Sequence, residues 1–487
     1  MEQGLARVLE RFREISAVPR CSGQESGARE LVERWASGLS FDAAVDGAGN
    51  LLVRVPPPAG GSRRPASAQP NTVVLQGHLD MVCEKEQGWA HDFTRDPIEP
   101  RLQGEWMHAA GTTLGADNGI GVALAMEAAE HAAPRPPLEL LFTVGEEVGL
   151  TGAAALDPAA LTGRMLLNLD SEHDGVLTVG CAGGEDCVLS FPAPREPLGP
   201  GMRILRLQAG GLVGGHSGVD INAGRANANL LVARTLRRLL GCLDLALLAI
   251  HGGSAPNAIP RDAQALLAVP PDAVERAEAM VSELQEAARR EYRGVEERLA
   301  LTIAPAPEQP VASALASASA RRLVDLLLEL PNGVASMSTE FPGTVQTSNN
   351  LGVLRSLESS IQIVSSQRSS SAQELASLTN RIEQAATLAG ASSTTGTSYP
   401  PWRPRLDSPL LGRCREVWRA RHGRDPEVRV IHAGLECAVI GMRCPGMDMV
   451  SLGPTIEDAH SPRERLSIPS LAAVQRYLSD LLASLAS

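Results

Sequence analysis

The stretch PLELLFTVGEEVGLTG, Pro137–Gly152, runs from an apolar segment into two adjacent glutamates. The apolar letters predict a buried strand, and Glu146 and Glu147 follow at its carboxyl end. Like charges side by side repel each other, and their burial is costly unless a positive charge lies between them. The two carboxylates therefore either face water or share a cation, and the rest of the sequence has to decide between these readings.

Length and composition indicate a globular protein of two or three domains. The chain has 487 residues, of which 44% are hydrophobic, which is too long for a single core. Its formal net charge is −12, and nucleic acids and anionic membranes both favour basic partners. Aromatic residues make up only 3%, which argues against a platform for base stacking. We therefore expect neither a nucleic-acid nor a membrane partner.

The cysteines and the N-terminus predict a reducing, cytoplasmic setting. None of the eight cysteines forms a CxxC pair, so a zinc knuckle is not indicated. A disulfide framework is not expected in a chain of this length, and we interpret Cys83 as a small buried apolar residue. The first letters, MEQGLARVLERFREIS, predict an amphipathic helix rather than a signal peptide, and no apolar run reaches the roughly 18 residues that span a bilayer.

Helices and strands alternate in the first part of the chain. The predicted helices are Leu5–Ile15, Ala28–Leu39 and Asn118–Ala132, and the predicted strands are Asn71–Val82, Pro137–Val144 and Arg164–Glu172. Apolar strands separated by helices are typical of a mostly parallel sheet that helices cover on both faces. PASAQP, Pro65–Pro70, is expected to be a flexible surface loop.

The pattern changes near Cys187, where strands such as GMRILRLQAG and LDLALLAIHGG begin to alternate with longer helices. This pattern predicts an α+β domain, and the Ser-, Thr- and Pro-rich segment Ala391–Pro404 is expected to be a linker. The α/β pattern then resumes, with helices at Pro409–Arg421 and Ser470–Leu485 and strands near Val428–Ile431 and Met447–Leu452. We predict one discontinuous α/β domain, 1–186 and 400–487, with a second domain inserted at 187–399.

Several residues with chemical potential follow the predicted strands of the first domain. His78 and Asp80 lie two apart in GHLDMV, so they share one face of a strand and could form half of a zinc site. Asp117 lies at a helix start, where it could also be a simple N-cap. Asp170 ends a strand and could be an ordinary turn residue. His460, in GPTIEDAHSPRERL, would on its own be a surface loop histidine.

Taken together, these residues indicate a metal centre. Open α/β sheets build their sites at the carboxyl ends of the strands, where these side chains are expected to gather. Two histidines and four or five carboxylates are too many for one ion and suit two ions about 3.5–4 Å apart that share a carboxylate and a water. Nitrogen and oxygen ligands without thiolate suit zinc, cobalt or manganese.

The ordered motifs of the chain resemble those of the M20 metallopeptidases, and specifically the bacterial aminoacyl-histidine dipeptidases, also called cytosolic non-specific dipeptidases. The motifs are GHLDMV, TTLGADNGIG, FTVGEEVGLTG, LNLDSE, GGHSGVDI and EDAHSPRERL, and the similarity extends from about Leu5 to the last helix. The resemblance implies a di-zinc exopeptidase fold with an inserted α+β lid domain. It also implies hydrolysis of dipeptides, including Xaa-His dipeptides such as carnosine.

The resemblance implies a role for each site residue of the first domain. Asp117 would bridge two divalent metal ions, and a cis peptide bond would follow it. The ligands of the first ion would be His78 and Asp170, and those of the second would be Glu147 and His460.

The remaining catalytic and substrate-binding roles also come from the resemblance. Glu146 would be the general base, and Asp80 would orient the histidine that precedes it in GHLDMV. In the lid, His216 would stabilise the oxyanion, while Asn257 and Arg368 would hold the substrate's carboxylate, which a guanidinium fits in a bidentate manner.

The two adjacent glutamates can serve as a metal ligand and a base only if the backbone turns between the strand and the glutamates. On a regular strand the two side chains would point to opposite faces, so we expect the chain to leave strand geometry at Gly145. Other functions stay open, namely a tripeptide aminopeptidase, an N-acyl amino acid amidohydrolase or a non-catalytic metal-binding protein. A homodimer through the lid is also expected from the resemblance.

Overall fold

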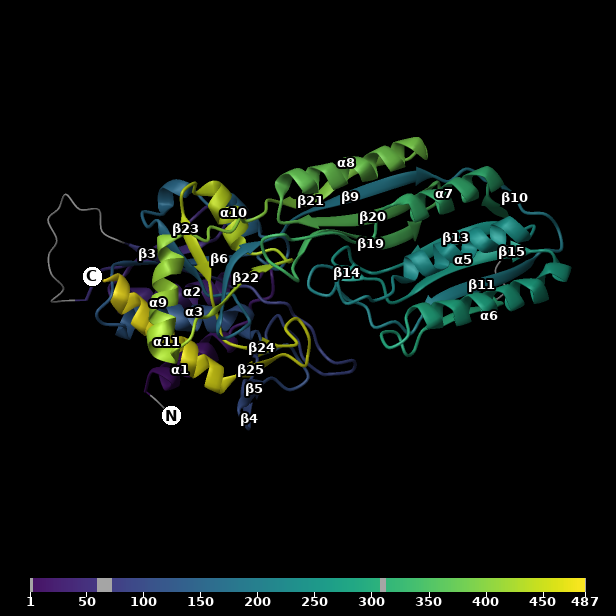
Figure 1. The fold of residues 1–487 in the computed structure, drawn as a ribbon. Helices are drawn as coiled ribbons and strands as arrows, with labels where there is room; N and C mark the ends of the chain where they lie inside the picture. The colour runs from purple at the N-terminus through teal and green to yellow at the C-terminus, as the bar shows by residue number, and fades with distance from the viewer. Residues whose placement is uncertain (1–2, 59–71, 307–311, 487) are drawn as a thin grey trace. The chain divides into compact units, whose positions relative to one another are not determined.

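The computed structural model describes residues 3–58, 72–306 and 312–486, so the expected loop Pro65–Pro70 lies outside the described residues. The chain divides into two compact units (Figure 1). Unit 1 comprises Met1–Cys181, Trp402–Val430 and Leu435–Ser487, and unit 2 comprises Ala182–Pro401 and Ile431–Gly434. The segments of each unit are therefore far apart in the sequence, and each unit is described by itself below.

Unit 1 is built on an eight-stranded sheet within the described residues, in the order β1-β2-β6-β3-β7-β23-β8-β22. The strand bounds are β1 Asp42–Val45, β2 Leu51–Val55, β6 Leu138–Thr143, β3 Val73–His78, β7 Met165–Asn168, β23 Asp448–Ser451, β8 Val176–Cys181 and β22 Glu427–Ile431. The central strands β6, β3, β7 and β23 run parallel. Every residue of β3 and β6 is buried, so both faces of the sheet are covered. The expected mixed, mostly parallel α/β sheet is confirmed.

Helices flank this sheet, and five of them (α1, α2, α3, α9 and α11) lie close to the predicted positions. They are α1 Gln3–Ser16, α2 Ser26–Gly38, α3 Ala116–His131, α4 Thr151–Ala155, the 3-10 turn η1 Pro158–Ala160, α9 Pro409–His422, α10 Glu436–Arg443 and α11 Ile468–Leu485. A smaller sheet joins β24 Ile456–Glu457, β25 Arg465–Ser467, β5 Trp106–His108 and β4 Arg101–Gln103. No helix in the described ranges is long and apolar enough to cross a membrane.

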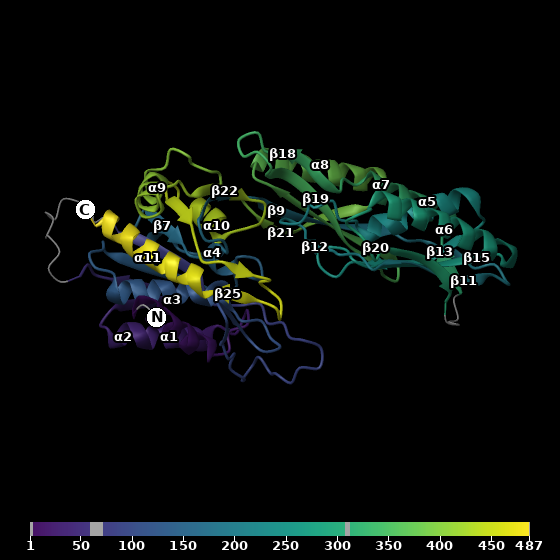
Figure 2. The ribbon, with the colours of Figure 1, turned by 60° about the horizontal axis from the view of Figure 1, so that its bottom comes forward.

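In its described residues, unit 2 is built on a nine-stranded sheet covered by four main helices. Its order is β16-β11-β15-β13-β19-β20-β9-β21, with β18 beside β19. The strand bounds are β9 Gly183–Pro192, β11 Arg203–Gly210, β13 Ala246–Gly252, β15 Ala263–Val269, β16 Ala300–Pro305, β18 Gly333–Met337, β19 Val345–Ser356, β20 Ser360–Ser369 and β21 Ser392–Tyr399. The helices are α5 Ala228–Cys242, α6 Val274–Glu291, α7 Ser317–Glu329 and α8 Ala372–Leu388. A 3-10 turn, η2 Pro271–Ala273, directly precedes α6. Figure 2 shows these helices and strands from a second direction.

The sheet of unit 2 consists of two halves that meet at β13 and β19. Among the residues that the structure describes, two register pairs join β13 to β19, namely His251 with Arg355 and Gly252 with Leu354. One half consists of β16, β11, β15 and β13, and the other of β19, β20, β9 and β21 with β18 beside β19. Helices α5 and α7 pack against each other. Short paired strands complete the unit, namely β10 Arg195–Pro197 with β17 Ser313–Leu315, and β12 Gly215–His216 with β14 Ala258–Ile259.

The segment predicted as a linker is partly a strand, and that prediction is wrong. β21, Ser392–Tyr399, pairs with β9 along most of its length. It is the edge strand of the sheet, and most of its side chains are exposed, so its small polar residues do not prevent pairing. Its composition resembles a linker because only its backbone contributes to the sheet.

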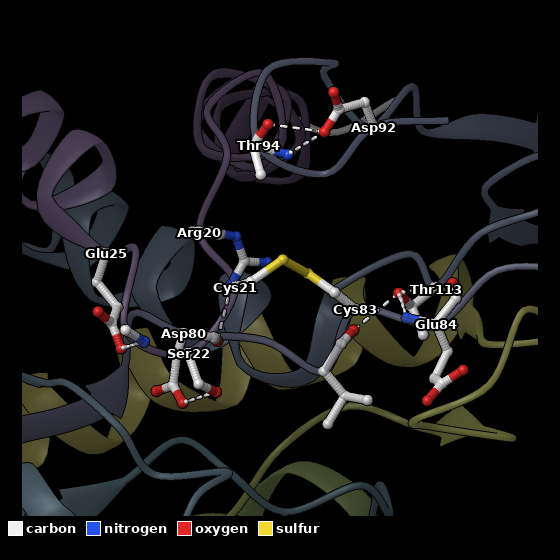
Figure 3. Close-up of a disulfide and its surroundings, with 12 residues drawn as sticks. Arg20, Cys21, Ser22, Glu25, Asp80, Cys83, Glu84, Asp92, Thr94 and Thr113 are labelled. Carbon is white, nitrogen blue, oxygen red and sulfur yellow. Dashed lines mark hydrogen bonds between the residues drawn. A yellow bond between two sulfur atoms is a disulfide. The ribbon is translucent and has the colours of Figure 1, made fainter. Parts of the chain in front are cut away.

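Two cysteines contradict the expectation of a chain without disulfides. Cys21 and Cys83 form a disulfide although 62 positions separate them in the sequence (Figure 3). Cys83 is half-buried and bonded, so its interpretation as a buried apolar residue is wrong. The two positions meet because Cys21 pairs with Met81, just beyond β3, in an isolated bridge. The other six cysteines all lie in described residues and form no disulfide; five are buried and Cys242 is exposed.

Candidate metal centre

His78 is the last residue of β3. Its ring lies beside the carboxylates of Asp117 and Asp170. Its Nε2 lies 3.0 Å from Asp117 Oδ1 and 3.4 Å from Asp170 Oδ1. Asp117 lies at the start of α3, and Asp170 lies two residues beyond β7, which is parallel to β3. The parallel strands therefore bring these side chains to one edge of the sheet, where His78 is almost fully buried.

A second histidine approaches the other side of Asp117. His460 Nε2 lies 3.0 Å from Asp117 Oδ2 and 3.1 Å from Glu147 Oε1. Each oxygen of Asp117 therefore faces one histidine, which is the arrangement that a bridging carboxylate needs. One ligand atom each from His78, Asp117 and Glu147 lies within 4.8 Å of the others.

The spacing of these atoms fits ligands of zinc-like ions. Zinc binds nitrogen and oxygen at about 2.0–2.2 Å in a tetrahedron, so two ligand atoms lie about 3.3 Å apart. The distances from the two histidines to their carboxylates, 3.0 to 3.4 Å, lie close to that value. Glu147 Oε1 and Asp170 Oδ1 are buried, and they face His460 Nε2 and His78 Nε2 at 3.1 and 3.4 Å. Oxygens in this state are suited to bind a cation.

The site also favours positive charge electrostatically. Burial lowers the pKa of His460, but hydrogen bonds and charges of Asp117 and Glu147 outweigh it and raise the pKa to about 12. Burial also lowers the pKa of His78, yet the charge of Asp170 and a hydrogen bond to Asp117 raise it well above its usual value. The carboxylates thus stabilise protons on both rings, and metal ions would take the place of these protons.

The two adjacent glutamates lie beyond the end of β6. The strand ends at Thr143, and Gly145 has a φ of +60°, so the expected departure from strand geometry is confirmed. A Cβ at this position would meet Thr151 Oγ1 at 2.2 Å, so only glycine fits the turn. Burial raises the pKa of Glu146 well above its usual value, and the charge of Glu147 adds to the effect. The structure thus gives the two carboxylates different environments.

Asp80 connects the β3 loop with the glutamate turn. Its Oδ1 and Oδ2 accept hydrogen bonds from the backbone N–H groups of Glu146 and Glu147, both at 3.1 Å. His78 Nδ1 lies 3.1 Å from the carbonyl oxygen of Asp80 and 3.4 Å from its carboxylate Oδ1. Burial raises the pKa of Asp80, but hydrogen bonds and the charge of His78 lower it to about 2. Asp80 is therefore placed to hold both the histidine ring and the turn that carries Glu147.

The Asp117 loop is held by residues that the sequence reasoning missed. Glu464 is buried and accepts backbone hydrogen bonds from Leu114, Gly115 and Asp117 at 2.8, 2.9 and 3.2 Å. Arg20 is also buried and donates to the carbonyl oxygens of Leu79, Asp80 and Gly115. No sequence signal distinguishes these two charged residues from exposed ones, since both lie in loops with ordinary composition.

The bond between Asp117 and Asn118 is cis, so the expectation of a cis peptide after Asp117 is confirmed. The Asn118 side chain accepts a hydrogen bond from the backbone N–H of His78 at 3.3 Å and donates to the carbonyl oxygen of Leu169 at 2.8 Å. This amide therefore connects β3, the start of α3 and the segment that carries Asp170.

Of the three substrate-binding candidates in unit 2, His216 and Asn257 lie close together. His216 is on β12, which pairs with β14, and the carbonyl oxygen of Asn257 accepts the N–H of Ser217 at 2.8 Å. The N–H groups of Gly218 and Val219 donate to His216 Nδ1 at 3.2 and 3.1 Å. Because Nδ1 accepts, the neutral ring carries its proton on Nε2, which makes Nε2 a donor. Asn257 is exposed.

Arg368 lies on β20 beside a second group of polar residues in unit 2. Its Nη1 donates to the hydroxyl of Tyr399 at 2.7 Å, and only 7% of its surface is exposed. Burial and then the charge of Arg368 lower the pKa of His432 to about 3, so this ring is neutral. A Cβ on Gly218 would meet the carbonyl oxygen of His432 at 2.2 Å, which places His432 beside the turn that follows His216.

Comparisons with known proteins point to one family. A family model, peptidase family M20/M25/M40, matches residues 74–484. The chain is 38% identical over 472 residues to the cytosol non-specific dipeptidase of Escherichia coli (strain K12), covering 97% of this chain and 96% of the relative. It is 36% identical to the crystal structure of aminoacylhistidine dipeptidase from Vibrio alginolyticus, with a TM-score of 0.80 over 98% of this chain and 96% of that one. Aminopeptidase PepT from Bacillus cereus, at 16% identity and a TM-score of 0.56, shares the fold over 99% of each chain.

Proposed function

The chain belongs to peptidase family M20/M25/M40, and from this premise we propose that it hydrolyses the peptide bond of dipeptides, including Xaa-His dipeptides such as carnosine. One observation carries the proposal: the two oxygens of Asp117 each face a histidine, 3.0 Å away, with a further carboxylate beside each ring. This set would hold two divalent ions, with zinc the preferred candidate and cobalt or manganese as alternatives.

The chemistry divides between the ions and the side chains. When bound, two such ions supply a water of lowered pKa and polarise the carbonyl of the scissile bond. Glu146 is the proposed general base, because it follows the strand end beside the proposed ligand Glu147 and burial raises the pKa of its carboxyl well above its usual value. It would take a proton from the attacking water and return it to the leaving amine.

Three residues of unit 2 are proposed to bind the substrate. His216 would donate from Nε2 to the oxyanion of the tetrahedral intermediate, since its Nδ1 already accepts two backbone N–H groups. Arg368 and Asn257 would bind the C-terminal carboxylate of the dipeptide. The hydroxyl of Tyr399 holds the Arg368 guanidinium, which favours a fixed bidentate geometry.

Arg368→Lys should raise KM for dipeptides and lower kcat/KM by roughly 10- to 100-fold, because lysine keeps the charge but loses the fork. Arg355→Lys, on the neighbouring strand β19, is the matched control and should have no effect, since Arg355 is exposed. The measurement compares free dipeptides with their C-terminal amides. If Arg368→Lys weakened turnover of the amides as much as that of the free dipeptides, the assigned role would be wrong.

The test of the function itself is a panel of substrates for the purified protein with zinc, cobalt or manganese. We expect hydrolysis of carnosine and other dipeptides. Preferential cleavage of tripeptides would instead identify a tripeptide aminopeptidase, and preferential cleavage of N-acetyl amino acids would identify an N-acyl amino acid amidohydrolase. Binding of metal without cleavage of any of these amides would contradict an enzymatic role.

The cellular setting and the assembly are further proposals. We propose a cytoplasmic location, which the name of the Escherichia coli relative supports. A homodimer through unit 2 would use β16 or β21, because these are the edge strands of its sheet and every other strand of the sheet order has a partner on both sides. Light scattering on the purified protein would show whether it is a monomer or a dimer.

A further inference from the structure

The short segment between α1 and α2 contacts the loops that carry three of the proposed metal ligands, namely His78, Asp117 and Glu147. Arg20 donates to the carbonyl oxygens of Leu79 and Asp80, both at 3.0 Å, and to that of Gly115. The first two follow His78 and the third precedes Asp117. Ser22 Oγ donates to Asp80 Oδ2 at 2.8 Å, and Glu25 Oε1 accepts the N–H of Gly145 at 3.1 Å, just before the two glutamates.

Within this segment, Ser22 supports the turn that carries Glu147 through the side chain of Asp80. Asp80 Oδ2 accepts from both Ser22 Oγ and the N–H of Glu147. A shift of Ser22 would therefore change the orientation of the carboxylate that holds the glutamate turn. Ser22 touches neither substrate nor reacting atoms, so it is a positioning residue.

The Cys21–Cys83 disulfide fixes this segment to the far side of the β3 loop (Figure 3). Cys21 lies between Arg20 and Ser22, and Cys83 lies three residues beyond Asp80. The backbone N–H of Met81 also donates to the carbonyl oxygen of Arg20 at 3.1 Å. The disulfide is thus the covalent part of a contact that is otherwise made of hydrogen bonds.

The loop at Cys83 also contacts the chain that leads to Asp117. Thr113 Oγ1 donates to the carbonyl oxygen of Val82 at 2.8 Å, and the N–H of Thr113 donates to that of Glu84 at 2.9 Å. Both cysteines of the pair are half-buried, whereas five of the other six are buried. Because both cysteines of the pair are only half-buried, a reductant can reach their sulfur atoms.

We propose that the Cys21–Cys83 disulfide is a redox-sensitive positioning device for the metal centre, with Ser22 and Asp80 as its link to the glutamate turn. The proposal rests on the proposed function as a metallo-dipeptidase. The disulfide form is the competent one. A dithiol reductant attacks one sulfur, breaks the S–S bond through a mixed disulfide and is itself oxidised to a disulfide, while two electrons and two protons remain on the Cys21 and Cys83 thiols. Disulfides in a reducing compartment are usually transient and redox-sensing, which agrees with this role.

Loss of the covalent link should weaken metal binding more than substrate binding. Losing a residue that orients a metal ligand without binding the metal itself typically lowers metal affinity or activity by about 10- to 100-fold. We expect reduction to weaken Co²⁺ affinity and lower kcat by about tenfold, with KM for dipeptides nearly unchanged. Ser22→Ala should also lower the Co²⁺ affinity and kcat, while the disulfide stays intact.

The experiment titrates Co²⁺ into metal-free protein and follows the visible absorption of the bound ion. It compares oxidised protein, protein reduced with a phosphine that is removed before the titration, reoxidised protein, Cys21→Ser/Cys83→Ser and Ser22→Ala. Cys242→Ser, which removes an exposed thiol far from the disulfide in the sequence, is the control. Circular dichroism checks that each form is folded, and thiol titration checks the redox state.

Weaker Co²⁺ binding in the reduced protein, its recovery on reoxidation and no redox effect in Cys21→Ser/Cys83→Ser would support the proposal. Equal Co²⁺ affinity and spectrum in the oxidised and reduced wild-type protein would overturn it, even if the double variant failed to fold. Co²⁺ binding is measured without a substrate, so the redox test does not depend on activity. An oxidised protein that bound two ions but cleaved no dipeptide would contradict the proposed function, while the Co²⁺ titration would still test the redox proposal.

Discussion

Glu146→Gln should lower kcat on dipeptides by roughly 10²- to 10⁴-fold and leave the metal content unchanged. Glutamine has the shape of glutamate but cannot accept a proton from water or pass one to the leaving amine. Burial raises the pKa of the Glu146 carboxyl well above its usual value, and a raised pKa is what a carboxylate acting as general base and then acid needs. Metal analysis and steady-state kinetics on one preparation check both parts of the result.

The neighbouring residue provides the matched control. Glu147→Gln makes the same chemical change one position away, but Glu147 Oε1 lies 3.1 Å from His460 Nε2 in the proposed ligand set. This variant should lose bound metal as well as activity. Full metal content in Glu147→Gln, or near-native turnover in Glu146→Gln, would show that the two roles are assigned wrongly.

Asp117→Asn should have an equally large effect for a different reason. The variant replaces one carboxylate oxygen with an NH₂ group, which is a donor and cannot bind a cation. Both oxygens of Asp117 lie 3.0 Å from a histidine Nε2, so loss of either removes a ligand from one ion. We expect the metal content to fall from two ions per chain to one or none, and kcat/KM to fall by about three orders of magnitude.

A carboxylate elsewhere in unit 1 controls for this substitution. Asp157 caps the turn η1 by accepting the N–H of Ala159 and is exposed. Asp157→Asn should retain two ions and native turnover. An Asp117→Asn protein that bound two ions with native affinity would remove the bridging role from the account.

The sequence predicted the sheet of unit 1 well because its strands obey simple rules. β3 and β6 are mostly apolar, apart from the buried Gln76 and Glu139, and their burial on both faces agrees with that composition. The polar residues at their carboxyl ends could be recognised because they interrupt such runs. Gly145 could be assigned a turn because adjacent glutamates with different roles cannot both stay on a regular strand.

The strands at the centre of unit 2 were harder to recognise. β19 and β20 carry buried polar side chains, among them Asn349 and Gln367, whose amide groups meet at 2.8 Å. An apolar period therefore does not mark these strands. Their polar groups bond to each other and to neighbouring loops, as Asn350 does to the carbonyl oxygens of Pro256 and Ala258, and these contacts exist only in the folded sheet.

Contacts between distant loops could not be predicted from the sequence at all. Arg20 and Glu464 are charged residues in loops, and only the folded chain shows that they are buried against the Asp117 loop. The Cys21–Cys83 bond has the same cause, since its two halves belong to segments that meet only when β3 is in place. The chemistry of single residues could be inferred from the sequence, whereas the support behind them depends on tertiary structure.

The most direct test of the account is a titration of metal-free protein with zinc while hydrolysis of carnosine is measured. The account predicts no hydrolysis in the presence of a chelator, recovery on addition of zinc and a maximum when two ions are bound per chain. Full activity in the metal-free protein would contradict the central claim. So would a fully active protein that binds only one ion.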